Sequence, residues 1–322
     1  MSQPRYAFAV ARIRAKQASL MNASAFERLL ACKNAEEAIR LLQEQGFGTE
    51  DARDAEELLR AEEEKTWALM ASLVQSPAEL EMLRYPGDFH NLKAAMKTTA
   101  LPGRMPASYV HSGNLPPEKI REAVSAQNFF ALPAYMRTCA KEAWDVLTET
   151  QDGQLCDMIV DRGCLEAISA KGRQEENPAM ALYADVTVAC ADIKTALRCA
   201  KTRKPPAFVR RALAGCASLS AADLARAAGE GVDSVCAYLS GTRYAGAAEQ
   251  AKKSASSFER WCDDYLAQQL RGQQYTPFTL GPLVAYLNVK QNEIKSVRLI
   301  LAAKRNGLPE EAVRERLRKT YG

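Results

Sequence analysis

Hydrophobic and polar positions follow a helical period along most of the chain. Between Phe26 and Leu42 the apolar residues fall on one side of a helix, and Arg, Glu and Lys occupy the other side. Ser24 and Glu27 have the spacing of a capping box, which predicts that this helix begins there. Gly46 and Gly48 mark its C-terminal end.

A second predicted helix runs from Asp51 to Val74, and we interpret Glu62-Glu63-Glu64 within it as a solvated face. Pro77 and the pair Pro86-Gly87 interrupt the pattern, which resumes from Asp88 to Lys97. No segment of six or more residues shows the strict alternation of a half-buried strand. The pattern therefore predicts an all-α chain.

One triplet recurs at intervals of 101 residues: Asn91-Leu92-Lys93, Asp192-Ile193-Lys194 and Glu293-Ile294-Lys295. In each copy a polar or acidic residue is followed by an aliphatic residue and a lysine, and we expect each copy to begin a helix. A repeat of this period indicates an architecture built from similar supersecondary units.

Two further elements recur. Leu115–Ile120, Leu219–Leu224 and Leu308–Val313 each place a Leu before Pro or Ser at an expected helix start, with an aliphatic residue five positions later, as in a hydrophobic staple. Asn34–Phe47 aligns without gaps on Gly231–Tyr244, and an aromatic residue closes both segments. We therefore predict one compact body of three diverged helical repeats of about 100 residues. They cover roughly 1–110, 111–215 and 216–322.

Composition agrees with a well-filled helical protein. The 322 residues include 55 Ala, 47% are hydrophobic and 25% are charged, which is typical of globular chains, and Ala favours helix and close helix packing. The longest apolar runs are five residues, far short of the roughly 20 that span a bilayer, and the N-terminal segment does not have the pattern of a signal peptide. Nine scattered Cys without a C-x-x-C pair predict free thiols in a reducing cytoplasm.

Few candidates for catalysis emerge. His90 and His111 are the only histidines, so zinc-ligand spacing is absent, and no glycine cluster matches a phosphate-binding loop. Cys139 with His111 leaves a nucleophile pair open, and Cys156 is a second candidate thiol. For each Cys, however, a small buried hydrophobe is the favoured interpretation. We expect no metal, no cofactor and no nucleotide site.

Nucleic-acid binding is weakly indicated. The net charge is only +4, and the basic stretches lie at 201–211 and at Arg314–Lys319. In the second stretch, pairs at i,i+4 (Glu310 with Arg314, Glu315 with Lys319) are explained by a solvated helix face. Aromatic residues are not interleaved with the cations as in single-strand binders. We therefore expect no nucleic-acid partner.

Several motifs occur in combination from the start of the chain to its end: Tyr6-Ala-Phe-Ala-Val-Ala-Arg-Ile-Arg14, Asp88-Phe-His-Asn-Leu-Lys93, Ala285-Tyr-Leu, Glu293-Ile-Lys, Arg298-Leu-Ile-Leu, Lys304-Arg-Asn-Gly307 and Arg314-Glu-Arg-Leu317. With these motifs the sequence resembles one known family, the C subunit of the V-type (archaeal/bacterial vacuolar-type) ATPase or ATP synthase, whose eukaryotic counterpart is the d subunit. The resemblance covers essentially the whole chain and is weakest between 125 and 190.

The resemblance implies an all-helical funnel of three similar units about a pseudo-threefold axis. It also implies a non-catalytic central-rotor adaptor, peripheral at the cytoplasmic face of a membrane. Such an adaptor couples the central-stalk subunits to the membrane rotor ring, and so links proton or sodium transport to ATP synthesis or hydrolysis. The alternative from another class is a generic helical-repeat scaffold that binds soluble partners.

Six residues of these motifs and repeats are candidates for partner contact: Asp88, His90, Lys93, Lys194, Lys295 and Arg298. The three lysines form either a ring of positive charge or, as we favour, internal contacts that hold the repeats together. The sequence departs from the family pattern at one point, where Pro86-Gly87 separates Tyr85 from Asp88. We expect the helix entry to be bent there, which puts a role for Tyr85 in doubt.

Overall fold

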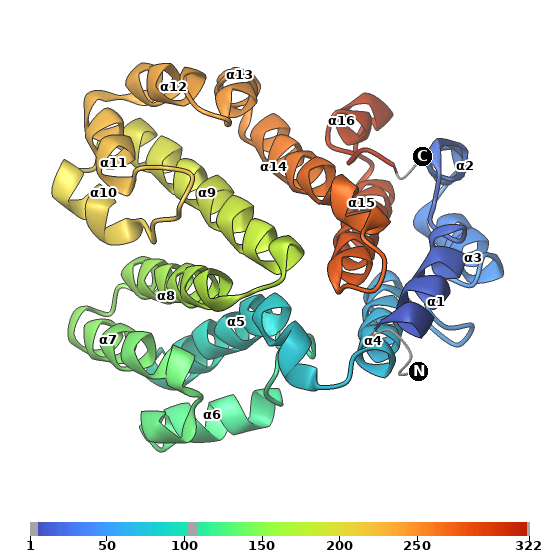
Figure 1. The fold of residues 1–322 in the computed structure, drawn as a ribbon, viewed down its shortest axis with the longest axis horizontal. Coiled ribbons are helices and arrows are strands. Elements are labelled where there is room, and N and C mark those ends of the chain that lie inside the picture. Colours follow the sequence, from blue (N-terminus) through green and yellow to red (C-terminus); the bar gives the residue numbers. More distant parts are fainter. Residues whose placement is uncertain (1–5, 102–107, 321–322) are drawn as a thin grey trace. The chain divides into compact units, whose positions relative to one another are not determined.

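The computed structural model describes residues 6–101 and 108–320, and every regular element in these two ranges is helical (Figure 1). The chain divides into two compact units. Unit 1 comprises Met1–Gln75, Asn177–Leu182 and Gly246–Gly322, and unit 2 comprises Ser76–Glu176 and Tyr183–Ala245. The predicted all-α class is confirmed for the described residues, whereas the three repeat boundaries stay a prediction.

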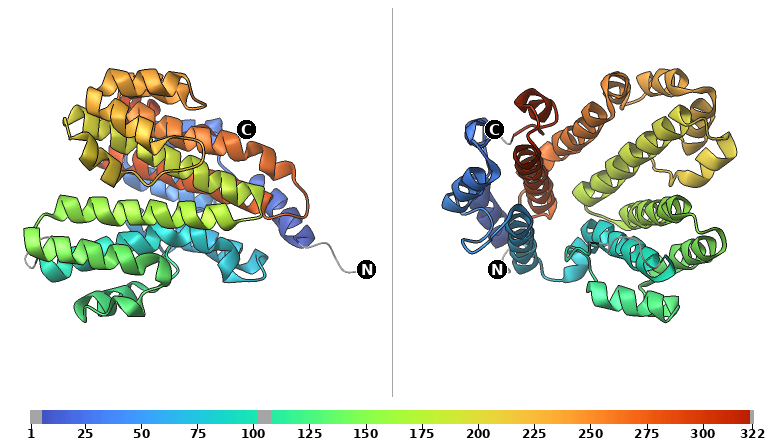
Figure 2. Two further views of the ribbon diagram at one scale, coloured as in Figure 1. Left: turned by 60° about the vertical axis from the view of Figure 1, so that its left-hand side comes forward. Right: turned by 180° about the vertical axis from the view of Figure 1, so that it is seen from behind.

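In unit 1 the longest helix, α15, is surrounded by shorter ones. It packs against α1, α3, α4, α14 and α16 and is buried along most of its length (Figures 1 and 2). The helices of this unit are α1 (Ala7–Gln17), α2 (Ala23–Ala31), α3 (Ala35–Glu44), α4 (Ala55–Leu73), α14 (Ala255–Leu270), η3 (Arg271–Tyr275), α15 (Gly281–Asn306) and α16 (Glu310–Arg314), with nearly all of α13 (Ala245–Lys253).

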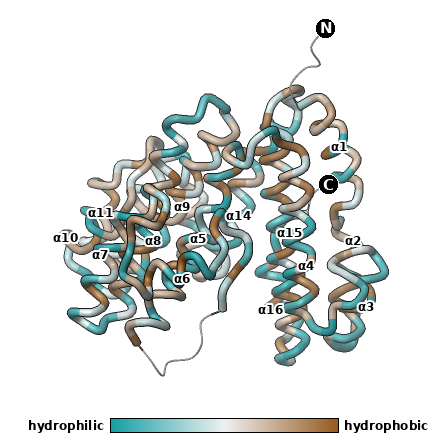
Figure 3. The backbone as a smooth tube through the Cα atoms, turned by 90° about the horizontal axis from the view of Figure 1, so that it is seen from below, coloured by the Kyte–Doolittle hydropathy of each residue, from teal (hydrophilic) through white to brown (hydrophobic). Residues whose placement is uncertain are grey.

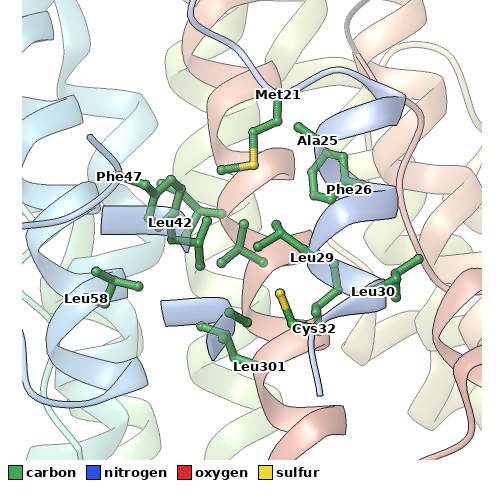
Figure 4. Packing of buried hydrophobic residues seen from close by; sticks show 14 of the residues in the cluster. Met21, Ala25, Phe26, Leu29, Leu30, Cys32, Leu42, Phe47, Leu58 and Leu301 are labelled. Carbon is green, nitrogen blue, oxygen red and sulfur yellow. The ribbon is translucent and has the colours of Figure 1, made fainter. Parts of the chain in front are cut away.

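The core of unit 1 joins the two ends of the chain. One apolar cluster contains a leucine from each of four helices (Figure 4): Leu29 of α2, Leu42 of α3, Leu58 of α4 and Leu301 of α15. All four side chains are buried, and each buried Leu stabilises the fold by about 1.5–3 kcal/mol. Figure 3 shows hydrophobic and hydrophilic positions interleaved along α4 and α15, as expected for helices with a buried and an exposed side.

The predicted capping box at Ser24 and Glu27 is wrong. Helix α2 begins at Ala23, and the side chain of Asn22 accepts a hydrogen bond from the backbone N–H of Ala25, so the cap position is already filled before Ser24. A second Asn cap, Asn34, starts α3 and separates the single helix predicted across 26–42 into two.

The predicted helix from Asp51 to Val74 is confirmed in position but begins later. Asp54 accepts a hydrogen bond from the N–H of Glu57, and α4 starts at Ala55. The interpretation of 62–64 as a solvated face is wrong for Glu62, which is buried.

Unit 2 is built on three long helices, α5, α8 and α9. Helix α8 packs against both α5 and α7, and α5 also contacts α6. The helices of this unit are η1 (Pro77–Leu80), α5 (Glu81–Ala100), α6 (Pro117–Ser125), η2 (Phe129–Ala131), α7 (Ala134–Thr150), α8 (Gly153–Gln174), most of α9 (Pro178–Lys201), α10 (Pro206–Ala212), α11 (Ala221–Glu230) and α12 (Val232–Ser240).

Helix α5 runs through Pro86, so the expected interruption there is wrong. Pro86 is the sixth residue of α5, and its missing N–H removes only the bond to the carbonyl of Met82. The 3-10 turn η1 leads directly into α5, and the capping box of Ser76 and Glu79 starts that turn. The helix therefore begins upstream of the proline and continues beyond it.

The second repeated element begins a helix in all three copies, as predicted. Ile120, Leu224 and Val313 are buried in α6, α11 and α16. The leading Leu differs, since Leu219 is buried and Leu308 is 49% exposed. The third element also has the same form twice, because Asn34 and Gly231 precede α3 and α12, and the closing aromatics Phe47 and Tyr244 are buried.

Candidate functional site

The three copies of the recurring triplet lie in the middle of α5, α9 and α15, so the expectation that each begins a helix is wrong. Their first residues are all buried: Asn91 is 0%, Asp192 2% and Glu293 6% exposed. A polar group in such a place needs hydrogen-bond partners. Each finds them on the backbone of a loop.

The donor and acceptor groups of each side chain match those of the loop backbone that it contacts. Asn91 accepts a hydrogen bond from the N–H of Val110 at 2.9 Å and donates one to the carbonyl of Val110 at 2.8 Å. Asp192 accepts two, from the N–H of Ala214 at 3.0 Å and of Gly215 at 2.8 Å. An amide has one donor group and one acceptor, and a carboxylate only accepts. The triplet therefore anchors a loop to the long helix.

The third copy follows the same rule. Glu293 accepts the N–H of Met21 at 2.6 Å, which fixes the segment between α1 and α2 against α15. Asp192 shows the energetic consequence of burying such a group. Burial raises the pKa of Asp192 to about 6, against the lowering effect of its two backbone N–H donors.

The lysines of the triplets pair with neighbouring helices. Lys93 on α5 lies 2.6 Å from Asp161 on α8, and Lys295 on α15 lies 2.7 Å from Asp263 on α14. Lys194 on α9 is exposed. Arg298 lies 3.1 Å from Glu56 of α4. Lys93, Lys295 and Arg298 therefore each join their helix to another helix of the chain.

Asp88 is the most deeply buried of the candidate residues. Its carboxylate accepts hydrogen bonds from the N–H of Leu115 at 2.9 Å, from Nδ2 of Asn114 at 2.8 Å and from the hydroxyl of Tyr135 at 2.9 Å. Burial raises the pKa of Asp88, and these three donors oppose that rise. No cation is among these donors, so Asp88 anchors the loop before α6 through hydrogen bonds.

The Pro86-Gly87 departure has a structural reason. A Cβ on Gly87 would lie 2.6 Å from the backbone nitrogen of Gly113, and one on Gly113 would lie 2.5 Å from Oδ1 of Asp88. Only glycine permits this approach of the loop to α5. The two glycines therefore bring the N–H of Leu115 within reach of Asp88.

Tyr85 and His90 flank this contact. Tyr85 is buried, and its ring centroid lies 4.1 Å from that of Tyr135, the residue that donates to Asp88. Tyr85 thus packs inside unit 2 although it is separated from Asp88 by two residues. His90 is exposed, and its Nε2 lies 2.9 Å from the carbonyl oxygen of Ser108.

Sequence reasoning missed a buried cluster of charges in unit 1. Nζ of Lys290 lies 2.5 Å from Oε1 of Glu62 and 2.5 Å from Oε1 of Glu293. Glu62 also accepts the N–H of Gly48 at 2.8 Å. Burial disfavours the charges of Glu62 and Lys290. The positive charge of Lys290 nevertheless lowers the pKa of Glu62, and the two carboxylates raise the pKa of Lys290. Together with Met21 and Gly48, the cluster joins three segments to α15.

The candidate thiols do not have the environment of nucleophiles. Burial raises the pKa of Cys139 to about 12 and that of Cys156 to about 11, which keeps both protonated. Cys139 donates to the carbonyl of Met136 at 3.2 Å. Seven of the nine Cys are buried, as the interpretation as small hydrophobes predicts.

Within residues 6–101 and 108–320, no cluster of three His, Cys, Asp or Glu side chains is arranged to hold a metal ion. Over the same part of the chain, no helix combines the length and apolarity needed to cross a bilayer.

Comparison with known proteins agrees with this picture. The family model for the ATP synthase (C/AC39) subunit matches residues 9–316. The chain is 24% identical to the V-type sodium ATPase C subunit of Enterococcus hirae, over 96% of this chain and 97% of the relative. It is 27% identical to the V-type ATP synthase C subunit of Thermus thermophilus, again over 96% and 97%. The A-type ATP synthase C subunit of Methanocaldococcus jannaschii is 22% identical, over 97% and 86%. The chain, matched from its first helix to beyond its last, belongs to the ATP synthase (C/AC39) subunit family.

Proposed function

We propose that this protein is the non-catalytic adaptor of a rotary V-type ATPase or ATP synthase, which couples the central stalk to the membrane rotor ring. In this role it transmits rotation between ATP chemistry and the movement of protons or sodium ions. It works at the cytoplasmic face of the membrane as a peripheral subunit. The near full-length family match carries the proposal.

The anchored long helices support a mechanical role. Rotation is transmitted only by a body whose parts do not slide, and close-packed helices are stiff. In α5, α9 and α15 a buried polar side chain ties a loop to the middle of the helix. We propose that these three ties, at Asn91, Asp192 and Glu293, resist shear within each unit.

Four of the six candidate contact residues hold elements of this chain together. We propose that Asp88, Lys93, Lys295 and Arg298 act within this chain, since each has an internal partner. The lysine positions then maintain the helix packing, and a ring of positive charge is not needed for partner binding. His90 is exposed, with Nε2 on the carbonyl oxygen of Ser108, and it remains our candidate for direct contact with other ATPase subunits.

An affinity pull-down tests the proposal. The full chain, tagged at its C-terminus, is recovered from native membranes after gentle solubilisation, and each co-eluting protein is identified by mass spectrometry. We expect a small hydrophobic ring protein together with stalk and nucleotide-binding ATPase subunits. Recovery of the chain alone, or only with proteins unrelated to ATP hydrolysis, would overturn the proposal.

A further inference from the structure

Three large aromatic side chains are exposed at one end of unit 1. Phe8 is 67%, Tyr275 68% and Phe278 52% exposed. Phe8 lies in the first turn of α1, Tyr275 is the last residue of η3, and Phe278 lies in the turn between η3 and α15. Helices α1 and α15 pack together, and Figure 2 shows the start of α1 and the turn before α15 at the same end. We call Phe8, Tyr275 and Phe278 the aromatic end.

The turn that carries two of these rings is held in shape by its own hydrogen bonds. The hydroxyl of Thr276 donates to the carbonyl of Gln273 at 2.7 Å and lies 2.9 Å from the hydroxyl of Thr279, which accepts the N–H of Gly281 at 3.1 Å. A Cβ on Gly281 would lie 2.6 Å from the Thr276 hydroxyl. The turn is therefore compact and depends on a glycine.

Phe278 adopts a left-handed conformation within this turn. Its φ is 64°, a region that bulky residues rarely occupy. Strain of this kind persists only where the surrounding structure enforces it, and it is concentrated at functional positions. Here it directs an aromatic ring to the outside of the molecule, where the ring does not stabilise the core.

The chain segments at this end carry no acidic residue. The ion pairs Glu62–Lys290 and Glu56–Arg298 show that α4 runs antiparallel to α15, so the end of α4 lies beside the start of α15. Residues 6–26, 66–75 and 265–289 contain no Asp or Glu. They do contain four exposed cations, Arg12, Arg14, Lys16 and Arg271.

The opposite ends of the same helices carry both signs of charge. Residues 50–57, at the start of α4, include five acids and Arg53, and Glu310 and Glu311 follow the end of α15 between Arg305 and Arg314. Surfaces of soluble proteins usually mix both signs in this way. The aromatic end of unit 1 is therefore distinguished by exposed cations in segments that contain no acid.

We propose that the aromatic end of unit 1, with Arg12, Arg14, Lys16 and Arg271, binds the surface of an anionic phospholipid bilayer. Aromatic rings favour the interface between headgroups and acyl chains, and cations near it are attracted to anionic lipid. The three cations of α1 lie within about 12 Å of Phe8 along the helix axis. Rings and charges can therefore reach the same surface together.

Vesicle flotation of the purified full chain tests this contact. The probes are vesicles of phosphatidylcholine alone and of phosphatidylcholine with 30% phosphatidylglycerol, by mole. We expect at least tenfold stronger partition into the anionic vesicles, since three or four cations contribute. The triple variant Arg12→Gln/Arg14→Gln/Lys16→Gln should lose at least tenfold of this binding.

Matched variants separate the surface from overall charge. Arg40→Gln/Arg53→Gln/Arg305→Gln removes three exposed cations from other parts of unit 1 and should change binding less than twofold. Phe278→Asn, which suits a left-handed residue, should keep the helical circular dichroism and weaken binding severalfold. Phe130→Ser, which removes an exposed ring from unit 2, should have no effect.

Two results would overturn the proposal. One is equal partition of the wild-type chain into both vesicles, and the other is equal loss of binding by the two triple variants. The assay contains none of the other ATPase subunits, so its failure leaves the adaptor function untouched.

Discussion

Lys290 lies between two buried carboxylates, with Nζ 2.5 Å from both Glu62 and Glu293. The three residues bring together the middle of α4 and the middle of α15, and through Glu293 the segment at Met21. A buried ion pair contributes little net stability when compared with apolar residues of the same shape. Its loss is more serious, because the remaining charges cannot reach water.

Lys290→Met should therefore destabilise unit 1 strongly. The substitution leaves Glu62 and Glu293 buried without their shared cation, and we expect a loss of about 3–5 kcal/mol in the free energy of unfolding. Urea unfolding followed by circular dichroism measures it. Lys295→Met, which breaks the more exposed pair with Asp263, should lose less than about 1 kcal/mol. Equal losses in the two variants would show that the cluster has no special role.

Asp192 should make stability depend on pH in the direction opposite to most carboxylates. Its pKa in the folded chain is about 6, above the ordinary 3.8, so the folded state binds the proton more tightly. Its contribution is fully present below pH 3.8 and is lost as the pH rises through about 6. Between low and high pH, the contribution of Asp192 to the free energy of unfolding changes by about 3 kcal/mol.

The comparison of wild type with Asp192→Asn isolates this effect. The variant places an amide N–H against one of two backbone N–H donors, which costs about 1–3 kcal/mol, but it does not titrate. Denaturant unfolding at pH 4 and at pH 7.5 should therefore show a smaller difference in the free energy of unfolding between the two proteins at the higher pH. A difference that does not change with pH would contradict the raised pKa of Asp192.

Gly87→Ala should disturb the contact between α5 and the loop before α6. The new Cβ would meet the backbone of Gly113 at 2.6 Å, and we expect a loss of about 1–3 kcal/mol. Thermal unfolding provides the measurement. Gly272→Ala is the matched control, because a Cβ there meets nothing within 4 Å; a loss of similar size in both would exclude the steric cause.

The three repeated lysines should be dispensable for assembly. In Lys93→Gln/Lys194→Gln/Lys295→Gln, largely exposed ion pairs are removed, each worth less than about 1 kcal/mol. We expect the variant to fold and to co-purify with the same ATPase subunits as wild type. Loss of the rotor ring from a folded variant would instead support a ring of positive charge.

Local patterns are sufficient to predict much of this fold. Helices such as α4 and α6 are predictable because periodicity, caps and breakers lie within a few residues of one another. The wrong predictions of helix starts and breaks arise where two local signals compete. Asn22 and Ser24 are both good caps, and the chain uses the first. Proline breaks helices in most sequences, but here α5 continues through Pro86 with the loss of one backbone hydrogen bond.

The buried charged cluster and the loop contacts of the triplets were harder to predict, because the residues that contact one another are distant in sequence. Glu62 in a run of three acids has the pattern of a solvated face until Lys290 is placed beside it. A usable signal was the pair Lys290 and Glu293, two opposite charges three residues apart that follow the apolar run Leu283–Leu287. The repeat at Asn91, Asp192 and Glu293 was visible, but their roles depend on the loop groups that face them.

The core of unit 1 can be completed only after the C-terminal helices of the chain have been synthesised. Helices α2, α3 and α4 leave the ribosome early, yet they pack against Ile294, Ile300 and Leu301, which follow at least 221 residues after the end of α4. At 5–20 residues per second this interval lasts about 10–40 s. The apolar faces of the first helices are uncovered during that time, while the whole of unit 2 is being made. Completion of unit 1 is therefore a late event, in which the last part of the nascent chain returns to the first.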